Sequence, residues 1–85
     1  MLFNEVFGHV LSEVRKSMNV TQEELAERSG LSRAYISRLE RNINDPQLLT
    51  VFKLSEGLHI DIVVLISKYQ ALIKEHKITL EDLSN

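Results

Sequence analysis

The sequence contains no cysteine, which excludes disulfides, thiolate catalysis and cysteine-ligated zinc. Only three glycines and one proline occur in 85 residues, so we expect long helices joined by short connections. The longest uninterrupted apolar run, residues 62–66, is far shorter than the ~20 residues that a membrane span needs. The N-terminus lacks the basic stretch of a signal peptide, and we expect a soluble protein of the cytoplasm.

Positive charge is also scarce, because ten Lys and Arg stand against twelve Asp and Glu, for a net charge of -2. Taken alone, this balance argues against a nucleic-acid partner, which normally binds a basic surface. The apolar share of 44% is enough for a packed core. A chain of this length forms one small domain of marginal stability, which association with a second copy would raise.

The residues of common catalytic and metal sites are isolated from one another. His9, His59 and His76 do not fall at a metal-ligand spacing, and the serines lie outside any nucleophile elbow. No glycine-rich phosphate loop is present. We therefore predict neither an enzyme nor a bound cofactor or metal.

Capping signals divide the first half of the chain into three helices. Apolar residues recur every three or four positions over residues 3–18, which predicts the first helix. Thr21 and Glu24 form a capping box, and Gly30 suits a left-handed turn, so the second helix is expected over 22–29. Ser32 is the cap of a third helix over 33–41.

Two more helices are expected in the second half. Asp45 before Pro46 predicts a cap and a first helical residue, and this fourth helix ends near Gly57. Its apolar surface comes from Leu48, Val51, Phe52 and Leu54. Asp61 predicts the start of a fifth helix that extends to about His76. A short last turn is expected over residues 79–82.

The helices over 22–29 and 33–41 are separated by three residues including Gly30, which is the helix-turn-helix arrangement. In the second of them, Ile36, Leu39 and Glu40 share one face by their spacing. A carboxylate on a face that points toward the core needs a partner. Arg15, at the margin of the first helix's apolar stripe, is the candidate, and we predict an Arg15–Glu40 ion pair.

The opposite face of the helix over 33–41 carries three arginines with small residues between them. Arg presents a planar fork that matches phosphate and guanine, and small side chains allow close approach to base edges. Within 33–42, three Arg stand against one Glu, so the net charge of -2 is an average of unlike regions. This face, in the second helix of a helix-turn-helix, predicts a surface that reads DNA.

Two segments of the chain resemble the Cro/C1 (XRE-type) helix-turn-helix family: TQEELAERSGLS over residues 21–32 and YISRLER over residues 35–41. The likeness covers about residues 7–66. It implies an all-α, compact five-helix, lambda-repressor-like DNA-binding domain over 1–69, with a C-terminal helical extension or tail over 70–85. Members are mostly bacterial or phage transcriptional regulators. Residues 33–42 are similar to the controller proteins of restriction–modification systems.

The resemblance also implies roles for individual residues. Those that read bases would be Arg33, Ala34, Ser37 and Arg38. Those that hold the sugar-phosphate backbone would be Gln22, Ser32, Tyr35, Arg41 and Asn42. Arg15 and Glu40 match a structural ion pair of the family, in agreement with the argument from helical faces. His59 stands where the family usually has Gly, in a turn that His can still adopt.

Family members bind DNA as dimers, so that two helices enter successive major grooves ~34 Å apart. Residues 62–66 are more apolar than one small core can bury, which predicts a homodimer with an interface at Val63, Val64, Ile66 and Tyr69. The expected partner is a two-fold symmetric double-stranded operator. The alternative is a protein-binding regulator of the antitoxin type, in which residues 70–85 dock on a partner protein.

Overall fold

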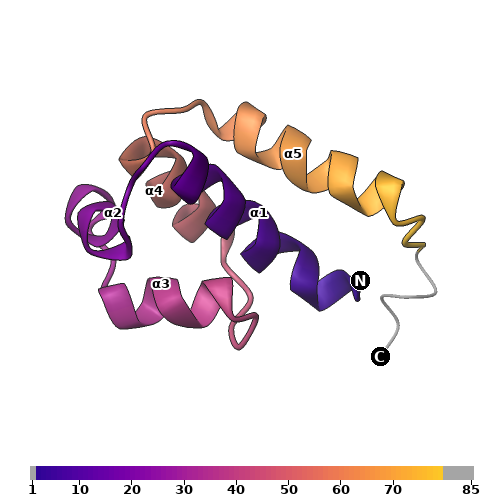
Figure 1. The fold of residues 1–85 in the computed structure, drawn as a ribbon, viewed down its shortest axis with the longest axis horizontal. Coiled ribbons are helices and arrows are strands. Elements are labelled where there is room, and N and C mark those ends of the chain that lie inside the picture. The colour runs from indigo at the N-terminus through magenta and orange to yellow at the C-terminus, as the bar shows by residue number, and fades with distance from the viewer. Residues whose placement is uncertain (1, 80–85) are drawn as a thin grey trace.

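The computed structural model describes residues 2–79 and contains five helices with no strand in that range. They are α1 (Phe3–Ser17), α2 (Gln22–Ser29), α3 (Arg33–Glu40), α4 (Leu48–Gly57) and α5 (Ile62–Glu75). Figure 1 shows α1 between α3, which packs along one side of it, and α5, which packs along the other. The predicted all-α, five-helix fold with a helix-turn-helix in α2 and α3 is confirmed. The last turn expected over 79–82 lies almost entirely outside the described residues.

The caps of α2 and α3 form as predicted. Thr21 Oγ1 accepts a hydrogen bond from the Glu24 N–H at 3.0 Å, and Glu24 Oε1 accepts one from the Thr21 N–H at 3.1 Å. Gly30 ends α2 in the left-handed region at a φ of 78°. Ser32 Oγ then accepts from the Tyr35 N–H at 3.1 Å, which begins α3. Gly30 at the end of α2 and the Ser32 cap at the start of α3 therefore fix the two ends of the short turn between the helices.

The start of α4 differs from the prediction. The helix begins at Leu48 rather than Pro46, and the cap position belongs to Gln47, whose side chain makes no cap hydrogen bond. Pro46 instead lines a hollow beside Tyr69 of α5, while the backbone at Gln47 is still extended. Asp61 does occupy the cap position of α5, but it also makes no side-chain cap hydrogen bond. Acidic residues before these two helices therefore mark their starts without capping them.

Buried aliphatic residues from all five helices meet around α1. The core consists of Val6, Val10, Leu11, Val14, Val20, Leu25, Ile36, Leu39, Val51, Leu54, Leu58 and Leu65. Of the four apolar residues predicted on α4, only Val51 and Leu54 are buried, whereas Leu48 and Phe52 are exposed. Each fully buried aliphatic side chain stabilises the fold by about 1.5–3 kcal/mol relative to an exposed one.

The close approach of α1 to the end of α3 depends on Gly8. A Cβ at this position would lie 2.6 Å from the Leu39 carbonyl oxygen and 2.8 Å from that of Glu40. Such distances are too short for non-bonded atoms, so a larger residue would push the two helices apart. The C-terminal end of α3 is thereby held directly against α1.

Asn42 and His59 are two of the residues other than glycine that adopt left-handed conformations after a helix. Asn42 has a φ of 63° just after α3, and His59 has a φ of 57° between α4 and α5. The His59 conformation confirms that this turn survives without glycine. After Asn42, the N–H of Ile43 bonds back to the Arg38 carbonyl at 2.9 Å. The loop that follows α3 therefore folds back against the last turn of that helix.

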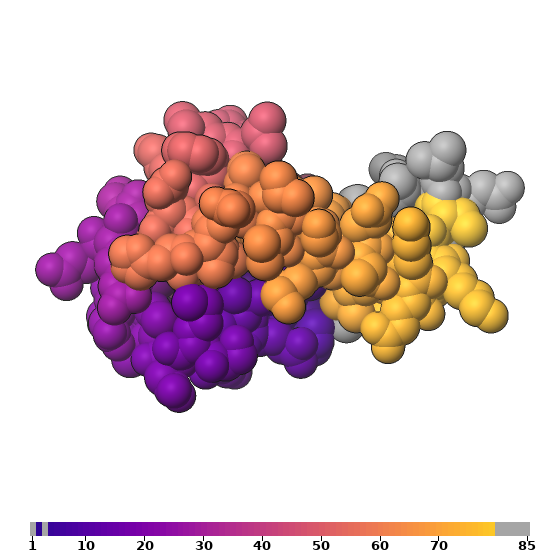
Figure 2. All heavy atoms as spheres, turned by 90° about the horizontal axis from the view of Figure 1, so that it is seen from above, coloured from indigo at the N-terminus to yellow at the C-terminus, as the bar shows by residue number. Residues whose placement is uncertain are grey.

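Figure 2 shows α5 lying along one face of the molecule, with α4 on one side of it and α1 on the other. The helix continues without a break across residues 69 and 70. Its inner side is covered by the core, where Leu65 is fully buried and Ile73 and Ile78 pack against the cluster. Its outer side is open to solvent. The helices α3 and α5 lie on different sides of α1 (Figure 1).

Candidate nucleic-acid interface

The two faces of α3 have opposite environments. Ile36 and Leu39 are buried in the core, while Arg33 and Ala34 are exposed. Their spacing places the exposed residues on the side away from α1. The core therefore orients α3 so that its arginine-bearing face points to solvent.

An ion pair attaches α1 to α3. Arg15 Nε donates to Glu40 Oε2 at 2.6 Å, and Arg15 Nη2 donates to Glu40 Oε1 at 2.9 Å. Arg15 Nη1 donates in addition to the Val20 carbonyl at 2.8 Å. The hydrogen bonds to Glu40 raise the pKa of Arg15 above its ordinary value. With only 10% and 8% of the two side chains exposed, the predicted Arg15–Glu40 pair is confirmed as a buried one.

The four residues assigned to base reading lie on one turn and a half of α3. Arg33 Nε contacts Glu23 Oε1 of α2 at 2.7 Å. Arg38 Nε donates to Asn44 Oδ1 at 3.1 Å, and its guanidinium lies 5.8 Å from the centre of the Tyr35 ring. Ala34 is exposed and Ser37 is half-buried between the arginines. The structure thus brings the four together on one face, where Arg33 and Ala34 are exposed and Ser37 and Arg38 are half-buried.

The residues assigned to the DNA backbone surround that face, although several also have partners within the protein. Gln22 Nε2 donates to Glu40 Oε1 at 3.0 Å, which leaves one amide hydrogen for another acceptor. Arg41 Nε donates to Ser37 Oγ at 3.2 Å. Ser32 is exposed at the cap of α3. These positions lie around both ends of the exposed face of α3.

Tyr35 and Asn42, the other two residues assigned to the DNA backbone, lie closer to the protein. The Tyr35 hydroxyl is 3.5 Å from Thr50 Oγ1 of α4, and the ring is half-buried. The Asn42 side chain lies against α1, where its Oδ1 is the atom closest to a Cβ built at Gly8. Tyr35 therefore links α3 to α4, and Asn42 packs at the junction of α3 with α1.

Sequence reasoning missed Glu23 and Asn44 as neighbours of the site. Glu23 is part of the capping region of α2, and Asn44 belongs to the loop after α3. The Glu23 carboxyl accepts a hydrogen bond from its own backbone N–H. This bond first, and the charge of Arg33 next, lower the pKa of that carboxyl below its ordinary value. Only the three-dimensional turn between α2 and α3 brings Glu23 to Arg33, ten positions away along the chain, so periodicity gave no signal for this contact.

The residues assigned to a dimer interface divide between two sides of α5. Val63, Val64 and Ile66 are all exposed, whereas Tyr69 is half-buried. The rings of Tyr69 and Phe7 of α1 pack edge to face, with their centres 6.1 Å apart and their planes at 73°. Burial, together with the charge of Asp45, raises the pKa of the Tyr69 hydroxyl. The ring of Tyr69 therefore packs mainly within its own chain.

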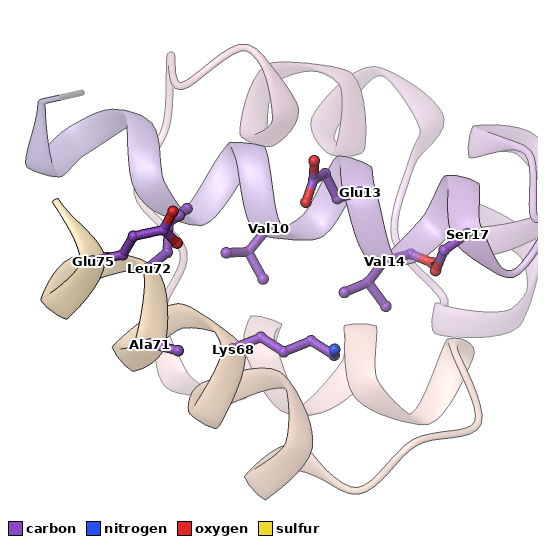
Figure 3. A pocket seen from close by; sticks show the side chains of 8 residues that line it. All are labelled: Val10, Glu13, Val14, Ser17, Lys68, Ala71, Leu72 and Glu75. Carbon is purple, nitrogen blue, oxygen red and sulfur yellow. Dashed lines mark hydrogen bonds between the residues drawn. The ribbon is translucent and has the colours of Figure 1, made fainter.

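Within the part of the chain that the structure describes, hollows adjoin α5 on two sides. One, of about 290 Å³, lies between α4 and α5 and is lined by Asn4, Phe7, Asp45, Pro46, Leu48, Val51, Ile66 and Tyr69. The other, of about 300 Å³, lies between α1 and α5. Figure 3 shows Val10 and Val14 of α1 on one side of this second hollow and Lys68 on the other. Neither hollow contains a group of three metal-ligating side chains, and none exists elsewhere among residues 2–79.

Within the described residues, no helix has the length and apolar character required to cross a membrane.

The helix-turn-helix family model matches residues 11–65. The HTH-type transcriptional regulator y4dJ of Sinorhizobium fredii is 33% identical over 67 residues, which cover 79% of this chain and 87% of that protein. Control protein C.SmaI of Serratia marcescens is 32% identical over 68 residues, which cover 80% of this chain and 81% of that protein. The immunity repressor of Bacillus phage phi105 is 33% identical over 70 residues, covering 82% of this chain and 48% of that protein.

Solved structures give the same result. The wild-type restriction-modification controller protein C.Esp1396I superposes with a TM-score of 0.78 at 29% identity, covering 86% of this chain and 96% of that one. The restriction-modification controller protein C.AhdI from Aeromonas hydrophila superposes with a TM-score of 0.69 at 35% identity. The match covers 73% of this chain and 94% of that one. The fold and the site define a helix-turn-helix DNA-binding protein. The chain belongs to the Cro/C1 (XRE-type) family of helix-turn-helix transcriptional regulators, whose members are not enzymes.

Proposed function

We propose that two copies of this chain bind a two-fold symmetric operator in double-stranded DNA and thereby regulate transcription in the cytoplasm. The observation that carries the proposal is the exposed face of α3, where Arg33 and Arg38 flank Ala34 and Ser37 while the opposite face is locked into the core. In this arrangement α3 enters the major groove and α2 lies across it. The likeness to a phage immunity repressor and to control proteins supports a regulatory role.

Arg33 and Arg38 are the residues that we propose to read bases. A guanidinium donates two parallel hydrogen bonds to guanine O6 and N7, and such a pair contributes about 1–3 kcal/mol of discrimination against other bases. Ala34 and Ser37 carry small side chains, so α3 can lie deep in the groove and contact a thymine methyl or a base edge. Base recognition thus depends on two arginines in the one helix.

The remaining polar residues are proposed to position the protein on the phosphates. Arg41 is a cation at the C-terminal end of the face, while Ser32, Tyr35 and Gln22 offer N–H and O–H donors around its start. Asn42 is proposed to act through its backbone and its position near Arg41. With so few cations, the binding of unrelated sequences should be weak, and affinity then depends on two half-sites bound together.

A face made by α4 and α5 supports the dimer. Val63 and Ile66 of α5 are 69% and 39% exposed, and Leu48 and Phe52 of α4 are exposed too. Ile66 and Leu48 border the same hollow, so the apolar surfaces of the two helices join there. Such a joined apolar surface is unusual on a lone small domain and is typical of an interface. We propose that a second copy covers it.

The geometry of α5 distinguishes the exposed residues of the proposed interface. At about 100° per residue, Val63 and Ile66 lie about 60° apart, whereas Val64 lies about 160° from Ile66. Val64 instead shares a stripe with Lys68, Ala71 and Glu75, which line the hollow against α1 (Figure 3). We therefore propose that Val63 and Ile66 form the centre of the interface, that Tyr69 supports Ile66 from behind, and that Val64 lies at its edge.

The experiment that tests this function is selection of bound sequences from a random pool of duplex DNA with the purified protein. The proposal predicts enrichment of a site with two-fold symmetry and a guanine in each half-site. Recovery of sequences without a common motif would contradict it. The alternative role, docking of a foreign protein on residues 70–85, has less support, because Ile73 and Ile78 already pack against the protein's own core.

A further inference from the structure

The arginines on the outer face of α3 share one mode of attachment. Arg33 is held through Nε by Glu23 at 2.7 Å, and Arg38 is held through Nε by Asn44 at 3.1 Å. Arg41 follows the same pattern, with Nε bonded to the Ser37 hydroxyl and carbonyl at 3.2 and 3.3 Å. In each case the partner binds the side of the guanidinium and not its end.

The buried Arg15 shows the contrast. Its Nε, Nη1 and Nη2 all donate to protein acceptors, so the whole group is used internally. A guanidinium has five N–H donors, of which Nε supplies one and the two Nη atoms supply four. Within residues 2–79, the structure gives Arg33 an ion-pair contact at Nε with Glu23 and gives Arg38 a hydrogen bond from Nε to Asn44. Their Nη ends therefore remain available to a ligand.

This geometry matches the recognition of guanine. The two acceptors O6 and N7 of one guanine lie side by side at the edge of the major groove and bind two N–H donors of one guanidinium. The Nη1 and Nη2 end of an arginine supplies such a pair while its Nε stays bound to the protein. A free arginine side chain must lose about 2 kcal/mol of rotamer entropy when it is fixed, and a side chain that is already held loses less.

We propose that Glu23 and Asn44 are positioning residues that hold Arg33 and Arg38 by their sides, so that the free end of each guanidinium faces a guanine. This inference rests on the proposed function and adds two residues outside the reading helix to its specificity. Glu23 is also expected to strengthen binding to DNA with a guanine at the Arg33 position and to weaken binding to DNA of any other sequence. The carboxylate favours a guanine contact by orienting Arg33, but it weakens the attraction of Arg33 to any phosphate, because the charge is already paired.

The contacts that hold Arg33 differ from those that hold Arg38. Arg33 and Glu23 are 61% and 64% exposed, so their pair is in the class that contributes little to folding, and its loss should leave the domain folded. Arg38 has a second support in the Tyr35 ring at 5.8 Å. Removal of Glu23 should therefore release its arginine more completely than removal of Asn44. Glu23 is the better position for the test.

The test measures the binding of the full chain to three duplexes at one salt concentration. They are the selected operator, the same operator with the Arg33 guanine replaced, and a scrambled duplex. The variants are Glu23→Ala, Glu23→Gln and Glu27→Ala. Glu27 is an exposed acid one turn further along α2, and the structure gives it no arginine partner among residues 2–79. It therefore controls for the loss of one negative charge.

For Glu23→Ala we expect the preference for the operator over the guanine-replaced duplex to fall about fivefold, and binding to the scrambled duplex to rise. Glu23→Gln keeps an acceptor for Nε and should retain most of the preference while it raises binding to the scrambled duplex. Glu27→Ala should leave the preference unchanged. Asn44→Ala is expected to lower the preference at the Arg38 base pair by a smaller factor.

An unchanged preference in Glu23→Ala, or the same fall in Glu27→Ala, would overturn the positioning role while the wild-type protein still selects its operator. If the wild-type protein itself does not distinguish the three duplexes, the proposed function fails and this inference fails with it. The two failures are therefore distinct. Circular dichroism melting of each variant checks that the fold is intact.

Discussion

Arg15 of α1 and Glu40 of α3 form a buried pair that is joined by two hydrogen bonds, at 2.6 and 2.9 Å. Glu40 also accepts from Gln22 at the start of α2, at 3.0 Å. One carboxylate thus connects the first three helices, and it does so at the C-terminal end of the helix that presents the arginines. The orientation of α3 depends on this contact as well as on the core.

Substitution of one member of the pair should strongly destabilise the domain. Glu40→Ala leaves the Arg15 guanidinium buried with fewer acceptors, and the loss of a partner from such a pair costs about 3–5 kcal/mol. Urea unfolding followed by circular dichroism measures the change. Replacement of both residues, as in Arg15→Met with Glu40→Leu, should restore much of the stability, since no buried charge is left. A Glu40→Ala variant as stable as the wild type would show that the pair is not structural.

The capping box of α2 predicts a dependence of stability on pH. The backbone N–H of Thr21, followed by its hydroxyl, lowers the pKa of the Glu24 carboxyl. A carboxyl whose pKa is lower in the folded than in the unfolded state stabilises the fold above its unfolded pKa, and this contribution is lost as the pH falls through the lowered value. The melting temperature of the wild type should therefore fall in acid more steeply than that of Glu24→Gln. Parallel pH profiles would contradict the assignment.

The same motif predicts the effect of losing the cap itself. Thr21→Ala removes the acceptor of the Glu24 N–H bond and should destabilise the domain by about 1 kcal/mol. Thermal denaturation at neutral pH measures it. Thr21→Ser keeps an acceptor at the same position and serves as the control. Equal losses in the two variants would show that the methyl group, and not the hydrogen bond, is what α2 requires.

The arginines of α3 should separate into two classes. Arg33→Ala and Arg38→Ala should each lower the affinity for the operator by about 1–3 kcal/mol and relax the preference at one base pair. Arg41→Ala should weaken binding to all sequences alike and reduce the salt slope by about one. Competition binding at several salt concentrations distinguishes the classes. An Arg33→Ala protein with unchanged base preference would show that the reading face is elsewhere.

Adjacent valines of α5 test the proposed dimer. Val63 lies on the exposed apolar side that α5 shares with α4, so Val63→Glu buries a charge in the interface and should give a monomer by sedimentation velocity. Val64 lies on the stripe toward α1, and Val64→Glu should leave the dimer largely intact. A wild-type protein that sediments as a monomer at tens of micromolar would contradict the dimer. If Val63→Glu and Val64→Glu both gave a monomer, the assignment of Val63 to the interface and of Val64 to its edge would be contradicted.

The local features of this fold could be predicted from the sequence because they depend on residues a few positions apart. Thr21 with Glu24, Ser32 before α3 and the left-handed His59 are of this kind. The Arg15–Glu40 pair spans a longer distance, but a carboxylate on a core-facing edge limits its possible partners to a few. The prediction of that pair therefore rests on the cost of an unpaired buried charge.

The features that could not be predicted depend on the way in which helices meet. Pro46 lines a hollow against α5 and does not begin α4, and Phe52 is exposed although its spacing fits an apolar stripe. The contacts of Glu23 with Arg33 and of Asn44 with Arg38 arise from the turn and the loop that flank α3. Neither follows from helical periodicity. Local patterns predict α3, but tertiary packing decides which side chains contact its arginines.

Hydroxyl-radical footprinting on the selected operator shows whether two copies bind one duplex with their α3 helices in successive major grooves. We expect two protected regions, related by two-fold symmetry, on one side of the duplex and with centres about 10 base pairs apart, or a multiple of this spacing. A single protected region the size of one half-site, without a symmetry-related second region, would contradict it.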